Sequence, residues 1–232
     1  MSAPKRNKSL RELTTLEGGC NGNVQLFLDR LGVPIEDMVP RERAAYDVIS
    51  LYRPARALLR SEDSQVQTQG REEMRLFAVS RIALVDKAQE EGDVLGVLHI
   101  MQTRASAFGV LGDQPMQVRT LRNIWQQLDA FPTDSADDVI FVRASVFSGL
   151  TENDIDFTKT VSMNDHLAFV RNSGDRQDPN FAGRAIVLAK RLVAEGRNGD
   201  ARALLHTAIL SDFSKEDQVA DANAYLLELV GK

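Results

Sequence analysis

The sequence predicts an all-α protein of about nine or ten helices, packed against one another as antiparallel helical hairpins. Apolar residues recur at intervals of three and four along most of the chain, which is the period of a helix with one buried face. Polar turns of two to six residues separate these segments, and such short connections favour neighbours in space. Because each helix alone would leave an apolar stripe in water, consecutive helices are expected to pair.

The amino terminus, residues 1–22, is expected to be a flexible basic arm. Lys5, Arg6, Lys8 and Arg11 face a single acidic residue within the first twelve positions. The segment ends in three glycines within five positions, which indicates a turn or loop. It is not a phosphate-binding loop, because no Lys-Ser or Lys-Thr pair follows the glycines and no apolar strand precedes them.

A group of amino-terminal helices is expected over residues 23–60. A short amphipathic helix occupies residues 24–31, and Gly32 and Pro34 end it. A longer helix then begins near Pro40, because proline is tolerated in a first helical turn, and runs to about residue 59.

Pro54 is expected to kink or split this longer helix near Leu51, since proline removes a backbone donor. Residues 61–70 follow, and Val66 is their one large apolar residue. This composition predicts a solvated connection, which we interpret as the best candidate for a boundary between subdomains.

Residues 71–131 are expected to form a central helical hairpin and a further helix. The first helix, 71–91, is the longest helical pattern, and Gly92-Asp93 separates it from a second at 94–110. The third helix covers 114–131. The residues predicted to share the buried side of the first helix are Met74, Phe77, Ala78, Ile82, Val85 and Ala88.

Residues 135–232 are expected to form a carboxy-terminal helical subdomain. Its first segment, 137–151, is rich in β-branched and aromatic residues, which favour a strand. A helix is nevertheless expected there, because Ser135 followed by Asp138 is a helix-start signal and a lone strand would have no partner. A loop is expected over 151–161, and Ser162 is expected to cap a helix that runs through Arg171.

Residues 179–213 form the clearest hairpin, with a polar turn at 195–200 between two apolar-periodic helices. The helix that follows is expected to begin at Ser214, with Asp217 completing its cap. Small and bulky residues alternate along the hairpin where its two helices approach closely. They are Leu188, Ala189, Leu192 and Gly196 on the first side and Ala201, Leu205 and Ala208 on the second.

This arrangement resembles one tetratricopeptide (TPR) repeat, about 35 residues long, although Phe213 stands where that family usually has a proline and the first-helix aromatics are absent. The resemblance implies a TPR-like or α-solenoid arrangement at the carboxy-terminal end, with the last helix, 214–232, as its cap. It also implies that a protein partner binds along the first helix, where Ile186 and Lys190 would contact it.

A second segment, residues 87–112, has the order Ala-Glu-Glu-Gly-Asp, two leucine turns, then Ala and Phe-Gly. It resembles the central helical region of some phage small terminase subunits, which assemble as rings and bind DNA. This resemblance implies an alternative function, a nucleic-acid-binding packaging protein whose contacts would come from Lys5, Arg6, Lys8 and Arg11.

Catalytic, cofactor and metal sites are not expected. His99, His166 and His206 are far apart and lie in no metal-binding spacing, and Cys20 has no cysteine neighbour. Paired carboxylates such as Asp137-Asp138 stand at turns or helix starts, where they favour the helix dipole or solvate the surface. Arginine pairs, such as 119/122 and 184/191, are interpreted mostly as solvated faces.

The charge balance and the single cysteine argue against some classes of partner and location. The 28 Lys+Arg against 33 Asp+Glu give a net charge of -5, so broad neutralisation of a phosphate backbone is not expected. The single cysteine and the lack of a long apolar run predict a cytoplasmic protein, or part of a particle assembled in the cytoplasm, with no membrane partner. The preferred function is a non-enzymatic interaction or assembly scaffold that binds another protein or itself as a homo-oligomer.

Overall fold

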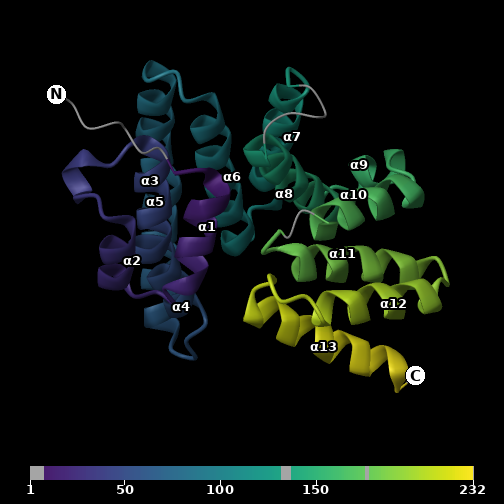
Figure 1. The fold of residues 1–232 in the computed structure, drawn as a ribbon. Helices are drawn as coiled ribbons and strands as arrows, with labels where there is room; N and C mark the ends of the chain where they lie inside the picture. The colour runs from purple at the N-terminus through teal and green to yellow at the C-terminus, as the bar shows by residue number, and fades with distance from the viewer. Residues whose placement is uncertain (1–7, 132–136, 176–177, 232) are drawn as a thin grey trace. The chain divides into compact units, whose positions relative to one another are not determined.

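The computed structural model describes residues 8–131, 137–175 and 178–231 of the chain (Figure 1). Within these residues the regular secondary structure is entirely helical, so the prediction of an all-α fold is confirmed. The elements run from α1 to α13, which exceeds the nine or ten helices expected. Several segments interpreted as loops or arms from their polar composition are in fact short helices.

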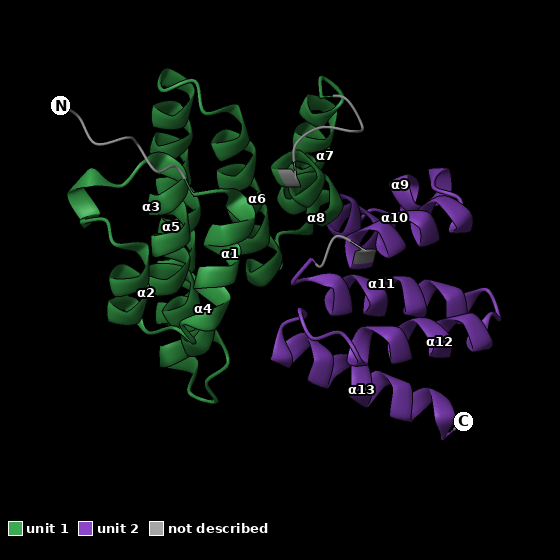
Figure 2. Ribbon diagram, viewed as in Figure 1, with its two compact units in different colours: residues 1–146 green, residues 147–232 purple. Residues whose placement is uncertain are grey.

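The chain divides into two compact units, residues 1–146 and 147–232 (Figure 2). The division falls inside helix α8 (Asp137–Asn153), so residues 61–70 do not separate the units as the sequence suggested. Each unit has its own buried apolar side chains, and the units are described separately below.

Unit 1 begins with helix α1 (Leu10–Gly19), which corrects the prediction of a flexible arm over this part of residues 1–22. Ser9 and Glu12 close a capping box at its start, each side chain bonding the backbone N–H of the other. Buried apolar side chains hold the helix in place. They include Leu10, Leu13 and Cys20.

Helix α2 (Val24–Leu31) is confirmed, with Gly32 in the left-handed conformation at its end. A 3-10 turn, η1 (Ile35–Asp37), leads into α3 (Pro40–Asp47). The Glu42 carboxylate accepts a hydrogen bond from the backbone N–H of Val39, which satisfies one of the free donors at the start of α3.

The predicted interruption of the helix near Leu51 is confirmed as a split: a π-helical turn, η2 (Val48–Tyr52), separates α3 from α4 (Arg53–Leu59). The Arg53 N–H donates to the Val48 carbonyl, five residues back rather than four. Because Pro54 has no N–H to continue the ladder, the wider turn accommodates the missing bond.

Helix α5 (Ser64–Glu90) begins seven residues earlier than the sequence predicted, with Asp63 as its N-cap. The helix therefore includes most of the polar segment 61–70, which the prediction of a solvated connection did not recognise. It packs against α3, α4 and α6. Polar composition failed as a signal here because only one face of the first two turns contacts the rest of the unit.

Helices α6 (Val94–Leu111) and α7 (Gln114–Leu128) follow after tight turns. Gly92 and Gly112 each adopt positive φ in these turns, which an L side chain rarely tolerates. Among the described residues α6 is the one helix long and apolar enough to cross a membrane. Its packing against α3, α5 and α7 accounts for that composition, because a core helix is apolar on several faces.

Helix α8 confirms the helical interpretation of 137–151 over the competing strand. Its β-branched and aromatic side chains, among them Val142, Val146 and Phe147, are buried on several sides. This burial outweighs their strand propensity, which reflects packing environment more than the backbone. Arg143 secures the helix by donating to the carbonyls of Leu128 and Phe131 at the end of α7.

Unit 2 continues with α9 (Ile155–Thr160) and α10 (Met163–Asp175). The expected loop at 151–161 is wrong, because Asp154 caps a helix by accepting from the Phe157 N–H. Ser162 caps α10 as predicted, accepting from the Asp165 N–H at 3.1 Å. The helix runs beyond the predicted end at Arg171.

Helices α11 (Phe181–Ala194), α12 (Asn198–Ile209) and α13 (Glu216–Val230) complete unit 2 and pack against one another (Figure 1). The predicted hairpin of α11 and α12 is confirmed, with Gly196 in its turn. Ser214 does not cap α13. Its hydroxyl instead accepts from the Ala182 N–H at the start of α11, at 3.3 Å.

Candidate interaction site

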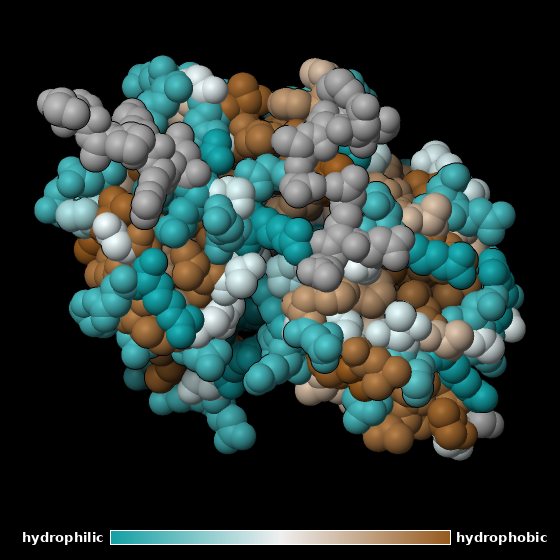
Figure 3. Space-filling view, in the orientation of Figure 1, coloured by the Kyte–Doolittle hydropathy of each residue, from teal (hydrophilic) through white to brown (hydrophobic). Residues whose placement is uncertain are grey.

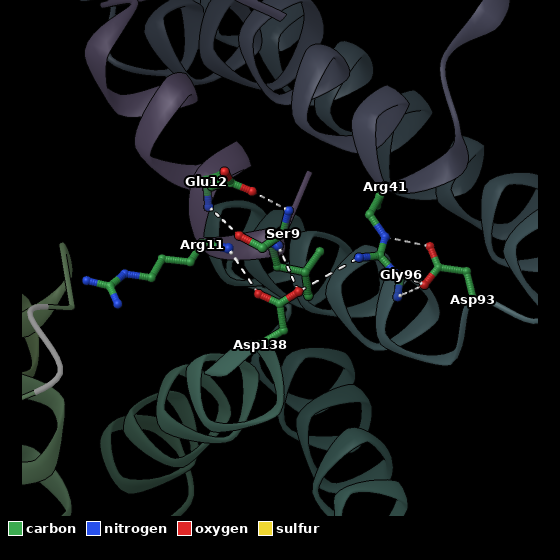
Figure 4. Close-up of polar contacts among 8 residues, drawn as sticks. Ser9, Arg11, Glu12, Arg41, Asp93, Gly96 and Asp138 are labelled. Atoms are coloured by element: carbon green, nitrogen blue, oxygen red, sulfur yellow. Dashed lines mark hydrogen bonds and ion pairs between the residues drawn. The ribbon is translucent and has the colours of Figure 1, made fainter. Parts of the chain in front are cut away.

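Arg41 in α3 is the centre of a polar cluster that connects four helices of unit 1 (Figure 4). Its Nε donates to Asp93 Oδ2 at 2.8 Å, and its Nη2 forms a second bond to the same carboxylate. Asp93 also caps α6 by accepting from the Gly96 N–H at 2.9 Å. On the other side, Arg41 Nη1 lies 3.8 Å from Asp138 Oδ2 at the start of α8.

Asp138 caps a helix to which it does not belong. Its carboxylate accepts from the backbone N–H groups of Leu10 and Arg11, at 3.0 and 3.4 Å, at the start of α1 (Figure 4). A negative charge is favourable at this position because the helix dipole is positive at its N-terminus. The carboxylate thus occupies the donors with which α1 would bind another anion.

The charges of this cluster stabilise one another. Hydrogen bonding to Asp93 raises the pKa of Arg41, and burial opposes that rise. Burial alone would raise the pKa of Asp93, but hydrogen bonds from Arg41 and the Gly96 N–H hold it below its usual value. Both groups are therefore ionised at neutral pH, and the cluster joins α1, α3, α6 and α8 as a structural connection.

His99 lies buried in α6 near Arg41 and Asp93. Burial, with a smaller contribution from the Arg41 charge, lowers the pKa of His99 to about 4. The imidazole is therefore neutral at neutral pH. The residue is only 6% exposed.

His166 in unit 2 is also buried, with its ring edge-on to Phe147 at 5.1 Å. Arg191 Nη1 lies 3.4 Å from its Nδ1, and Arg191 also donates to the Val161 carbonyl. Burial and the Arg191 charge lower the pKa of His166 to about 4. His206, by contrast, is exposed on α12. The described residues contain no group of three His, Cys, Asp or Glu side chains that could hold a metal ion.

Two further arginines are buried in ion pairs. Arg81 in α5 pairs with Asp47 in α3 and lies over the Phe77 ring, with 4.4 Å from its Cζ to the ring centroid. In unit 2, Arg184 Nη1 lies 2.8 Å from Asp178 Oδ2. The interpretation of residues 184 and 191 as a solvated face is therefore wrong for Arg184, which is 3% exposed. The first pair joins α5 to α3, and the second joins α11 to the segment that precedes it.

The predicted partner-binding residues, Ile186 and Lys190, lie one turn apart on α11. Ile186 is partly buried and packs against the unit 2 core, whereas Lys190 is exposed. The structure thus leaves Lys190 accessible and directs much of Ile186 inward. The resemblance to a TPR repeat had implied that both lie on one open surface.

The basic residues proposed for nucleic-acid binding are divided. Lys5 and Arg6 lie outside the described residues, while Lys8 and Arg11 lie at the start of α1. Hydrogen bonds from Ser9 lower the pKa of Glu12, and the charge of Lys8 adds to this effect. Burial raises the pKa of Glu42, and the charge of Lys8 opposes that rise. The charge of Lys8 is therefore partly opposed within the protein itself.

Exposed apolar side chains form a stripe along α5, which we call the α5 stripe and define as Leu76, Val79, Ile82 and Ala83. The first three are 69%, 63% and 45% exposed. Ile82 was predicted to lie on the buried side of this helix, and that prediction is wrong. The helix is apolar on two faces, so its periodicity alone could not show which face points outward.

A second exposed apolar stripe lies on α13 and includes Leu227 and Val230, 65% and 62% exposed, with Ala220 and Ala224 on the preceding turns. Figure 3 shows apolar surface (brown) over this helix at the lower right. The opposite face of α13 is buried through Ala222 and Leu229. The helix therefore carries apolar residues on both sides.

No protein family matches the chain, and comparisons with curated proteins and with solved structures found no match either.

Proposed function

We propose that this protein is a non-enzymatic interaction or assembly module, which binds another protein or a second copy of itself through exposed apolar helix faces. The observation that carries the proposal is the pair of stripes on α5 and α13, where large apolar side chains are 45% to 69% exposed. Exposed apolar residues arranged in a continuous stripe are typical of contact surfaces, whereas isolated ones need no explanation.

The position of α13 supports this proposal. Among the described residues it is the outermost helix of the α11 to α13 stack, and outermost helices of stacked helical proteins need a polar outer face for solubility. The outer face of α13 instead carries Leu227 and Val230. A helix laid along this face would continue the stack and bury both side chains, as in helix-in-groove recognition.

The burial of the ionisable groups also favours binding over catalysis. The histidines with lowered pKa, His99 and His166, lie inside their units, as do Arg81 and Arg184. A catalytic acid or base must reach the proton that it transfers. Groups buried in this way serve packing. We further propose that the carboxy-terminal end is TPR-like, and that the protein is a scaffold in the cytoplasm or in a particle assembled there.

The alternative, nucleic-acid binding through Lys5, Arg6, Lys8 and Arg11, has less support. The N-terminus of α1 already has a carboxylate, Asp138, where a phosphate would bind. The alternative predicts retention on DNA or RNA that weakens steeply with salt and is lost on deletion of residues 1–12. Unchanged retention after that deletion would exclude binding through the arm.

Affinity capture with the full-length chain as bait tests the main proposal. We expect a complex of defined mass by light scattering, and we expect Leu227→Glu combined with Val230→Glu to reduce the recovered partner at least about tenfold, because charges would enter a buried apolar contact. Asp221→Lys, a charge change at an exposed position of the same helix away from Leu227 and Val230, is the matched control. A monomeric wild type that retains no partner would contradict the proposal.

A further inference from the structure

We infer that the α5 stripe is a self-association surface, on which α5 of a second copy packs in the antiparallel direction around a two-fold axis. The inference rests on the proposed function and deepens it, because it names the partner as a second copy of this chain. It depends on the apolar stripe and on the charges that flank it.

The face is long enough for such a contact. Helix α5 has 27 residues, which corresponds to roughly 40 Å at 1.5 Å per residue. One side of it is buried within unit 1 by Met74, Phe77 and Ala78. The other side has no partner among the described residues, and Leu76, Val79 and Ala83 follow one another at spacings of three and four. This is the spacing of a helix-to-helix seam.

When a second copy of α5 runs in the opposite direction, the charges beside the stripe lie opposite charges of the other sign. Arg75 precedes Val79 by four residues, and Asp86 follows Ile82 by four. In an antiparallel pair centred between residues 80 and 81, Val79 lies level with Ile82 of the second copy. Arg75 then lies level with Asp86 of the second copy, and symmetry repeats both contacts.

The charges on the other edge of the stripe also pair with opposite charges in the antiparallel arrangement. Glu73 and Lys87 lie there, seven residues to either side of Ser80, so each would lie nearly level with the other in the second copy. In a parallel pair, every one of these charges would instead lie opposite its own copy. Charge pattern therefore selects the antiparallel direction, and it selects a second copy over a partner with an unrelated pattern.

Charge reversal tests this arrangement. Arg75→Glu alone places two like-charged pairs across the axis, and so does Asp86→Arg alone. Each variant is expected to weaken the dimer at least about tenfold in its dissociation constant. In a mixture of the two variants, the two introduced charges are opposite in sign and lie level with each other. The unchanged Asp86 of one chain likewise lies level with the unchanged Arg75 of the other, so the mixture is expected to form a heterodimer with affinity near that of the wild type.

The measurement is sedimentation velocity of the full-length chains over a range of concentrations, with circular dichroism to verify that each variant is folded. Both positions are exposed, and Arg171→Glu on α10 serves as a charge-reversal control away from the stripe. A wild-type chain that stays monomeric overturns the inference, and so does a mixture that associates no better than its components.

The measurements distinguish failure of the α5 inference from failure of the proposed function. If the wild type is monomeric but still binds a protein partner that the α13 substitutions release, the interaction module stands and the α5 inference is wrong. If the wild type dimerises but the charge variants dimerise equally well, another surface forms the contact, and the α5 inference is again wrong.

Discussion

Asp138 lies at the start of one helix, and its carboxylate caps another. It lies in the first turn of α8, yet it accepts hydrogen bonds from two N–H groups at the start of α1 and faces Arg41. The sequence indicated its position at a helix start. The second helix that uses its charge is 128 residues away in sequence, which no local pattern could show.

We expect Asp138→Ala to lower the free energy of unfolding by about 1–2 kcal/mol, because α1 loses its capping acceptor and Arg41 loses an opposite charge. Asp138→Asn keeps an acceptor and should cost less. Urea denaturation followed by circular dichroism measures both changes. Asp212→Ala, at an exposed aspartate, is the control and should leave stability nearly unchanged. Equal stability of Asp138→Ala and wild type would show that the cap contributes nothing.

His99 and His166 make stability depend on pH. Burial lowers the pKa of each to about 4, whereas the unfolded chain binds a proton near the ordinary value of 6.5. The unfolded state therefore binds more protons between these values, so stability is complete above about pH 6.5 and falls as the pH drops toward 4. Each histidine can account for about 3 kcal/mol of this loss.

Replacing His166 with Phe is expected to reduce the loss of stability between pH 6.5 and 4, because the titrating group is gone while the contact with Phe147 remains aromatic. Urea unfolding at several pH values provides the measurement. His206→Gln, at an exposed histidine on α12, should retain the pH dependence of the wild type. A His166→Phe variant with an unchanged pH dependence would exclude His166 as a source of it.

The close contact between helices α4 and α5 depends on Gly70 in α5. A Cβ at Gly70 would lie 2.9 Å from both Leu58 Cβ and the Leu59 backbone nitrogen, and 3.0 Å from the Ala55 carbonyl oxygen. Two of these three atoms belong to the backbone of α4, which cannot move aside cheaply. Gly70 thus permits the approach of α4 and α5.

We expect Gly70→Ala to destabilise the protein by about 1–3 kcal/mol through overpacking, although alanine is the better helix former. Gly199→Ala is the matched control, because a Cβ at that helical position meets nothing within 4 Å. It should leave stability unchanged or slightly raised. Thermal unfolding distinguishes the two, and a Gly70→Ala variant as stable as Gly199→Ala would contradict the close approach.

The division of the chain into two compact units predicts two unfolding transitions. Ile124 is fully buried in unit 1 and Leu188 in unit 2. Each substitution to alanine should cost about 2–5 kcal/mol and shift one calorimetric transition while the other stays in place. A single transition that both variants shift equally would show that the units unfold as one cooperative body.

The helical class, most helix positions and an interruption before Pro54 could be predicted from the order of residues alone. These features depend on neighbours within four or five residues, and their signals, such as the apolar period, the caps and the missing proline N–H, are written locally. The α1 and α9 helices were missed because their short, largely polar sequences carry weak periodicity.

Which charges are buried and which apolar faces remain exposed became known only from the contacts between helices. Arg81 meets Asp47 from 34 residues away, and Leu76 and Val79 are exposed on a helix whose opposite face is equally apolar. A helical period shows that a face exists, but not what covers it. That depends on contacts between distant segments, which the order of residues along one helix does not encode.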